Sequence, residues 1–68
     1  MMSYRVVNDS AQILASFETD EEAIRYAYGA THVNATDHLI SSAKELLEKN
    51  GTCAMSYGFS YVYVEKIN

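Results

Sequence analysis

The chain has 68 residues, and we expect one compact domain over residues 1–68, close to the smallest size that folds without disulfides or metals. Hydrophobic residues make up 49% and charged residues 21%, a globular composition that excludes a disordered tail. The formal net charge of −4 disfavours nucleic acid as a partner, because binding through phosphates needs clustered lysine and arginine.

The first segment, SYRVVNDSAQILASF, predicts a β-hairpin, since two β-rich runs flank the turn-forming residues 8–10. A loop of two or four residues would place these side chains on one face: Tyr4, Val6, Ile13, Ala15 and Phe17. A loop of three or five residues would place Arg5 and Val7 there instead. We prefer the first register because it keeps Arg5 out of the core, and it leaves Leu14 on the opposite face.

The next segment, FETDEEAIRYAYG, predicts a helix that begins at Thr19. Thr19 is a good N-cap, and Glu22 completes a capping box three residues later. The acids at this helix start are Glu18, Asp20, Glu21 and Glu22. The helix dipole explains them, since it favours negative charge in the first turn. They also form a candidate interface, an acidic knob that would fit a basic groove on a partner.

The segment TDHLISSAKELLEKNG predicts a second helix, capped by Thr36 and stopped by Asn50-Gly51. Its apolar residues recur at helical spacing and are expected to line one buried face: Leu39, Ile40, Ala43, Leu46 and Leu47. Lys44, Glu45 and Glu48 are expected to face water.

The last segment, GTCAMSYGFSYVYVEKIN, is too long for one strand. Residues 52–64 would extend ~43 Å at ~3.3 Å per residue, whereas a compact domain of this size is roughly 28 Å across. Either Gly58 marks a bulge or a turn, or the strand projects and pairs with another molecule. The predicted fold is therefore α+β, in the order β-β-α-α-β with the last strand long or doubled at Gly58. Two helices should cover one face of a small, mostly antiparallel sheet.

The two faces of this last segment are expected to differ in role. The bulky face, with Met55, Phe59 and Tyr61, is expected beneath the helices. The small-residue face is expected to stay open, with these apolar residues around it: Val7, Leu14, Val62 and Val64. Among these, Leu14, Val62 and Val64 are candidate interface residues.

Tyr57, Tyr61 and Tyr63 alternate along this segment, in a chain that has six tyrosines. Three interpretations are open: rings that roof the core, a protein interface, or an aromatic platform for single-stranded nucleic acid. The last interpretation needs basic residues on the same face, and only Arg5 and Lys66 could serve.

No set of residues predicts catalysis, a metal site or a cofactor. His32, His38, Asp37 and Cys53 lack any metal-ligand spacing, and the three glycines are too dispersed to cradle a phosphate. A lone cysteine at a strand start is more often a small buried residue than a nucleophile.

The composition also bears on location and assembly. Cys53 is the only cysteine, which favours a reducing compartment, and no apolar stretch approaches the length of a signal peptide or membrane span. We therefore expect a cytoplasmic protein without a membrane partner. A core of this size leaves only ~3–5 kcal/mol of stability, which favours a homodimer.

These observations lead to a functional hypothesis. We expect a small non-enzymatic protein–protein interaction module that self-associates and occupies a surface of a larger protein. In size and acidity the chain looks like the accessory or inhibitor proteins of bacteria and their phages. The alternative is a single-stranded nucleic-acid binder that uses a tyrosine-rich sheet face.

Overall fold

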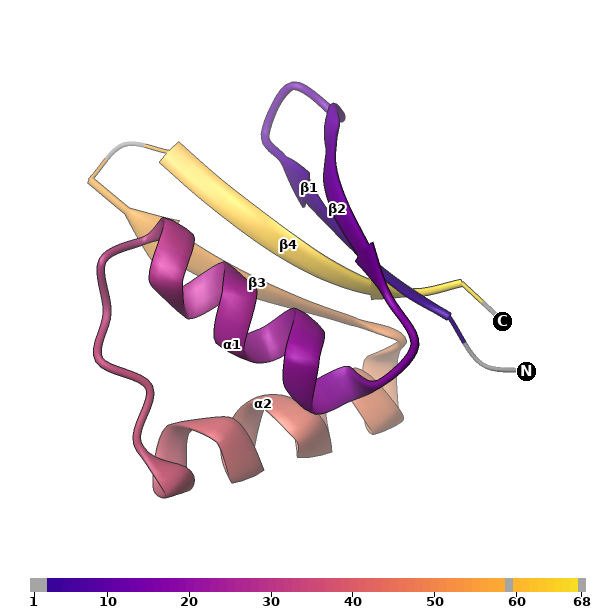
Figure 1. The fold of residues 1–68 in the computed structure, drawn as a ribbon, viewed down its shortest axis with the longest axis vertical. Coiled ribbons are helices and arrows are strands. Elements are labelled where there is room, and N and C mark those ends of the chain that lie inside the picture. Colours follow the sequence, from indigo (N-terminus) through magenta and orange to yellow (C-terminus); the bar gives the residue numbers. More distant parts are fainter. Residues whose placement is uncertain (1–2, 59, 68) are drawn as a thin grey trace.

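The computed structural model describes residues 3–58 and 60–67, and the side chain of Tyr57 is outside that description. The elements follow in this order: β1 Tyr4–Asn8, β2 Ile13–Phe17, α1 Asp20–Ala30, α2 Asp37–Asn50, β3 Thr52–Tyr57 and β4 Ser60–Lys66. The four strands form one antiparallel sheet in the order β2-β1-β4-β3 (Figure 1). The fold is α+β, as predicted, with the last strand doubled.

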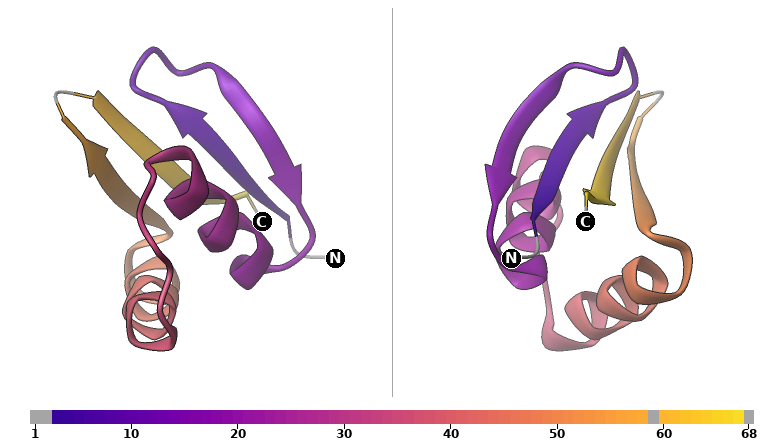
Figure 2. Two further views of the ribbon diagram at one scale, coloured as in Figure 1. Left: turned by 60° about the vertical axis from the view of Figure 1, so that its left-hand side comes forward. Right: turned by 90° about the vertical axis from the view of Figure 1, so that its right-hand side faces the viewer.

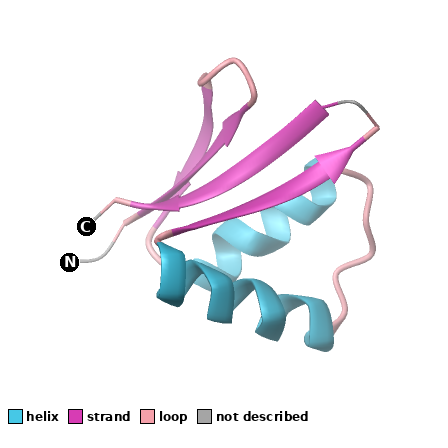
Figure 3. Ribbon diagram, turned by 180° about the vertical axis from the view of Figure 1, so that it is seen from behind, coloured by secondary structure: helices cyan, strands magenta, loops and turns pink. Residues whose placement is uncertain are grey.

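Both helices lie on the same face of the sheet (Figure 2). Helix α1 packs on β4, β1 and β2, whereas α2 packs on β3 and β4. Seen from behind, α2 lies beneath β3 and α1 is farther back (Figure 3). The core fills the space between the layers, and its largest fully buried side chains are Ile24, Leu47, Val6 and Val64. The other sheet face carries no helix.

The β1–β2 hairpin has the preferred register, because residues 9–12 form a loop of four. Tyr4 lies opposite Phe17 and Val6 opposite Ala15, so Arg5 stays off the core face. The Asn8 side chain organises the loop by accepting hydrogen bonds from the backbone N–H groups of Ser10 and Gln12, both at 2.9 Å.

A β-bulge in β2 overturns one part of this prediction. The register shifts between Val6 and Val7, so that Ile13 and Leu14 both oppose Val7. Ile13 was expected on the core face, but the extra residue moves it to the other face, where it is 60% exposed. A bulge at this position leaves no signal in the alternation of the sequence.

Both predicted helix caps are present. The Thr19 hydroxyl accepts a hydrogen bond from the Glu22 N–H at 3.3 Å and donates one to the Glu22 carboxylate at 2.8 Å. The predicted residues are thus paired, but both bonds use the Thr19 hydroxyl, whereas in a full capping box the Glu carboxylate accepts from the backbone N–H of the N-cap residue. Thr36 caps α2 through the Leu39 N–H at 3.2 Å. Gly51 ends α2 in the left-handed conformation, with φ of 78°.

The buried stripe of α2 is narrower than predicted. Ile40, Ala43 and Leu47 are buried, whereas Leu46 is 47% exposed and was wrongly expected in the core. Lys44, expected to face water, is half-buried and reaches across to α1, where its Nζ lies 3.1 Å from a Glu21 carboxylate oxygen. Leu46 therefore points away from α1, since residues 44 and 46 are about 200° apart around a helix.

The turn between β3 and β4 decides which side chains face the helices. Only two residues separate the strands, and Tyr57 lies opposite Ser60. Odd-numbered residues of β3 therefore share a face with even-numbered residues of β4. The longest molecular dimension is 33 Å, shorter than the extended segment, so the chain has to turn back.

This turn corrects the predicted faces of the last segment. Met55 is buried beneath the helices as predicted, and its neighbour across the ladder is Val62. Val62 and Val64 were expected on the open face, but they are 8% and 0% exposed and belong to the core. Tyr61, expected beneath the helices, lies on the opposite face and is 47% exposed. Phe59 lies outside the described residues.

Candidate interaction surface

The candidate site is the sheet face opposite the helices, which we call the open face. The two central strands supply Val7 from β1 and Tyr61 and Tyr63 from β4. The edge strands supply the bulge residues of β2 and the small side chains of β3, which are Ile13, Leu14, Thr52, Ala54 and Ser56. The face combines these apolar and aromatic side chains with small polar ones, including Ser16 of β2, and it lacks a covering layer within the described chain (Figures 2 and 3).

Aromatic side chains form the centre of the open face. The Tyr61 and Tyr63 rings stack with centroids 6.1 Å apart and planes 21° from parallel. Val7 lies opposite both Tyr63 and Ile13, and although it is not part of the core cluster it is only 6% exposed. Val7 therefore forms a small apolar centre on the open face, covered by the larger side chains around it.

The charges on the open face cancel within one chain. Arg5 and Glu65 lie opposite each other on β1 and β4, and the Arg5 Nε is 2.6 Å from a Glu65 carboxylate oxygen. The only other charged residue in the four strands, Lys66, belongs to the opposite face, where it pairs with Glu48 of α2 at 3.6 Å. The open face is thus neutral, although the whole chain carries −4.

Two of the four acidic residues at the start of α1 interact with other residues of the chain. The Glu21 carboxylate pairs with Lys44 and with Arg25, each at 3.1 Å. These partners, Lys44 first, lower the pKa of Glu21 below its ordinary value. The Glu22 carboxylate accepts a hydrogen bond from the Thr19 hydroxyl at 2.8 Å. Glu18 is exposed and Asp20 is half-buried, and the acidic interface that includes them stays a prediction.

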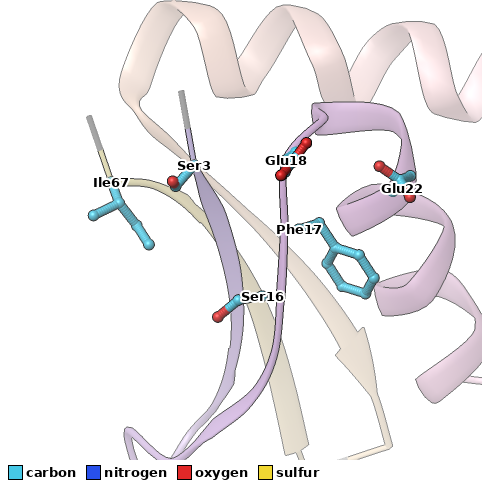
Figure 4. A pocket seen from close by; sticks show the side chains of 6 residues that line it. All are labelled: Ser3, Ser16, Phe17, Glu18, Glu22 and Ile67. Atoms are coloured by element: carbon cyan, nitrogen blue, oxygen red, sulfur yellow. The ribbon is translucent and has the colours of Figure 1, made fainter. Parts of the chain in front are cut away.

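A shallow hollow of about 490 Å³ lies at the end of β2 near the start of α1. Figure 4 shows Ser3 and Ile67 on one side of β2, and Phe17 and Glu22 on the other. The remaining lining residues are Ser16 and Glu18. Because the hollow is spread over both sides of the strand, its side chains do not converge on one ligand.

The residues considered for chemistry lie in β3, just after α1 and in the first turn of α2. Cys53 lies in β3 on the core face and is 5% exposed, and burial raises the pKa of its thiol, which disfavours the thiolate. His32 follows α1 with φ of 58°, and His38 is exposed in the first turn of α2. Among the described residues, no three histidine, cysteine or acidic side chains are grouped as metal ligands would be.

The structure therefore redistributes the predicted interface residues. Leu14 is on the open face as predicted, and Tyr61 and Tyr63 join it there, while Val62 and Val64 are buried in the core. The placement of the Tyr57 side chain lies outside the description. The signal for this arrangement was Gly58, where a turn was one of the predicted alternatives, and its φ of 60° is one that glycine adopts readily.

Comparisons with known proteins do not identify a function for this chain. No protein-family model matches the chain, and searches of curated proteins and of solved structures gave no match. Within residues 3–58 and 60–67, neither helix has the length and apolar character that crossing a bilayer requires.

Proposed function

We propose that this protein is a small, non-enzymatic protein–protein interaction module that self-associates and covers an apolar surface of a larger protein with its open face. The observation that supports this most is the combination of exposed apolar side chains with a self-neutralised ion pair. Leu14 and Tyr61 are 41% and 47% exposed there, and Arg5 is paired with Glu65. Exposed patches of this kind, rimmed by polar groups, are typical of protein interaction sites.

The charge pattern specifies the chemistry of the partner. A neutral apolar face gains most from a partner surface that is also apolar and uncharged, because unpaired charges buried in an interface are costly. Tyrosine adds large contact area at small entropic cost, which suits Tyr61 and Tyr63 to the centre of such a contact. An accessory or inhibitor protein would act in this way, by occupying a surface that another molecule needs.

Site-specific photo-cross-linking tests this proposal. A photoreactive phenylalanine analogue replaces Tyr61, and the matched control replaces Tyr26, a tyrosine on α1 with a similar exposure of 42%. We expect a discrete protein adduct from position 61 only. The captured protein, once purified, should bind the wild type at least ~10-fold more tightly than Tyr61→Asp, with Tyr26→Asp unchanged. Equal adducts at both positions, or adducts with nucleic acid alone, would contradict the proposal.

A second function has one observation in its favour. Two stacked tyrosines on a four-stranded sheet can stack with the bases of single-stranded nucleic acid. The open face has no net positive charge, which disfavours this function, because the nearby Glu65 carboxylate offsets the attraction of Arg5 for phosphate. Fluorescence anisotropy with labelled single strands at low salt separates the two functions. Binding that falls steeply with salt and is lost in Tyr61→Ala would favour the nucleic-acid function.

A further inference from the structure

Strand β3 has a free edge whose hydrogen-bonding groups can be identified residue by residue. The Lys66 N–H donates to the Gly51 carbonyl at 2.9 Å, so these two residues form a hydrogen-bonded pair of the ladder. Such pairs alternate along antiparallel strands. Following the β3–β4 register, the backbone groups of Thr52, Ala54 and Ser56 therefore point away from β4. We call these outward groups the β3 edge.

The β3 edge lacks the features that usually prevent strands from pairing with other molecules. Its sequence, TCAMSY, contains no charged residue and no proline, and its ladder with β4 is regular over six pairs. Natural edge strands are commonly blunted by lysine, proline or a bulge. The other edge of the sheet, β2, has such a bulge at Ile13 and Leu14. The two edges of this sheet thus differ, and only β3 offers a flat template.

An exposed apolar side chain lies on the flank of α2 that faces away from α1. Leu46 of α2 is 47% exposed and points away from α1, because Lys44 on the other flank pairs with Glu21. Since α2 packs on β3 and β4 while α1 packs farther along the sheet, the flank of α2 that carries Leu46 faces the same side as the β3 edge. Figure 3 shows β3 and α2 together on this side of the molecule.

We propose that a second copy of this chain pairs with the β3 edge. The two β3 strands run antiparallel about a two-fold axis at Ala54, and the two α2 helices meet beneath them at Leu46. This proposal rests on the proposed function, whose self-association it assigns to one surface. It leaves the open face available to the larger partner.

The edge is self-complementary in this arrangement. With Ala54 opposite its own copy, each Thr52 lies opposite the Ser56 of the second copy, so small side chains meet and no charges face one another. The outward N–H and C=O groups of all three residues then find partners. A second copy is therefore a better occupant than a charged or bulky strand.

The helix positions are compatible with the strand pairing. Gly51 joins α2 to β3. Ala54 lies ~10 Å from Gly51 along β3, and Leu46 lies ~8 Å from Gly51 along α2, so the two residues are at a similar distance from this connection. The two-fold axis lies midway between the two β3 strands, and the axis of α2 lies beneath the space between β3 and β4. These two axes are therefore about one strand spacing apart. The two copies of α2 would then be ~10 Å apart, the usual spacing of packed helices.

The size of this contact predicts a weak dimer. One six-residue strand and one flank of a helix bury less than the ~800 Å² per partner of a standard interface. We expect a dissociation constant on the order of 10 μM. The dimer should therefore form and dissociate over a concentration range that light scattering covers.

Light scattering after size exclusion, from ~1 μM to ~1 mM, is the first measurement, with variants in matched pairs. Ala54→Pro removes an outward N–H from the β3 edge, and Ser16→Pro removes the equivalent outward N–H from the β2 edge. Leu46→Lys places a charge on the α2 flank, and Leu14→Lys places one on the open face. We expect Ala54→Pro and Leu46→Lys to remain monomeric, and the two controls to dimerise like the wild type.

Amide hydrogen exchange supplies a readout that does not depend on any variant. The Ala54 N–H points to solvent in the single chain, so its exchange should slow at least ~10-fold as the wild type dimerises. If circular dichroism shows that Ala54→Pro does not fold, the Ala54 exchange rate and the Leu46→Lys variant still test the β3 pairing.

The outcomes separate this proposal from the proposed function. A wild type that stays monomeric over the whole range overturns both the β3 pairing and the self-association. The β3 pairing alone is overturned if Leu46→Lys still dimerises, if the Ala54 N–H of the wild-type dimer exchanges as fast as in the monomer, and if Leu14→Lys is monomeric. Those results would assign self-association to the open face.

Discussion

Two adjacent leucines of α2 provide a direct test of how the helix is oriented. Leu47 is 1% exposed and faces the sheet, whereas Leu46 is 47% exposed. Replacing each by alanine removes the same atoms, so any difference in the free energy of unfolding comes from their surroundings. The sequence pattern alone treats both residues as core, and only the structure separates them.

The expected effects differ several-fold. Leu47→Ala leaves a cavity among Ile24 and its neighbours, and such changes cost ~3 kcal/mol, with a range of about 2–5. A domain of this size has a total stability of only ~3–5 kcal/mol. The melting temperature should therefore fall by roughly 12–24 °C, at about 4–8 °C per kcal/mol. Leu46→Ala opens no closed cavity and should cost ~1 kcal/mol or less, since about half of its side chain is already in water.

Thermal unfolding followed by circular dichroism measures this difference. The protein concentration must be low, ~1 μM, so that any dimer contact of Leu46 does not add to its effect. Equal losses of melting temperature for the two variants would refute the orientation of α2. A larger loss for Leu46→Ala would show that the opposite flank of the helix is buried.

Further tests address the helix ends and the charged cluster. Gly51→Ala should lower the free energy of unfolding by ~1 kcal/mol, because φ is 78° at this residue. Gly29→Ala should raise it by ~0.5–1 kcal/mol, because Gly29 lies in a helix with open space around it. Urea unfolding measures both changes, and changes of the same sign would contradict the left-handed cap at Gly51. Thr19→Ala should cost ~1 kcal/mol in the same assay and Thr19→Ser little, because serine keeps the hydroxyl that caps the Glu22 N–H. Equal losses for the two variants would contradict this cap. The pKa of Glu21 is lowered in the folded state by Lys44, so its contribution to stability is present above the unfolded pKa near 4.5 and is lost as pH falls through the folded value. Unfolding measured from pH 7 to pH 2 should show the wild type more stable than Glu21→Gln at neutral pH, with the gap closing in acid, and a gap that is constant with pH would exclude the ion pairs as its cause.

The parts of the fold that could be predicted are those that local chemistry determines. The N-cap at Thr19 pairs it with Glu22, three residues later, and the stop at Gly51 needs one residue that tolerates positive φ. The preferred hairpin register followed from keeping Arg5 out of the core, and the bond between Arg5 and Glu65 explains where its charge goes instead. The helix caps depend on residues that are close together in the sequence, and the hairpin register depends on the large free-energy cost of burying the Arg5 charge.

The parts that could not be predicted depend on single-residue shifts in strand alternation. A bulge moves Ile13 to the open face, and a two-residue turn moves Val62 into the core and Tyr61 out of it. Each shift reverses the side chains on one side of it, because the side-chain period of a strand is two. The bulge changes only Ile13, since Ala15 and Phe17 keep the predicted face, whereas the turn changes every side chain of β4. The sequence around Gly58 allows a bulge, a turn or a straight extension, and these place the same residues on opposite faces. The candidate site was therefore predicted in kind, as an open sheet face with small residues, but only partly in its membership.

The two proposed surfaces share one strand, and this links them physically. Ala54 directs its side chain onto the open face and its backbone groups toward the β3 edge. Pairing at that edge would therefore join two open faces into one continuous face of eight strands, ~38 Å wide at ~4.8 Å per strand. Its middle would carry only the small side chains of β3, flanked on both sides by stacked Tyr61 and Tyr63. A larger protein that packs on this dimer needs a ridge to fill the central strip or a two-fold symmetric surface of its own, so dimerisation would itself select the partner.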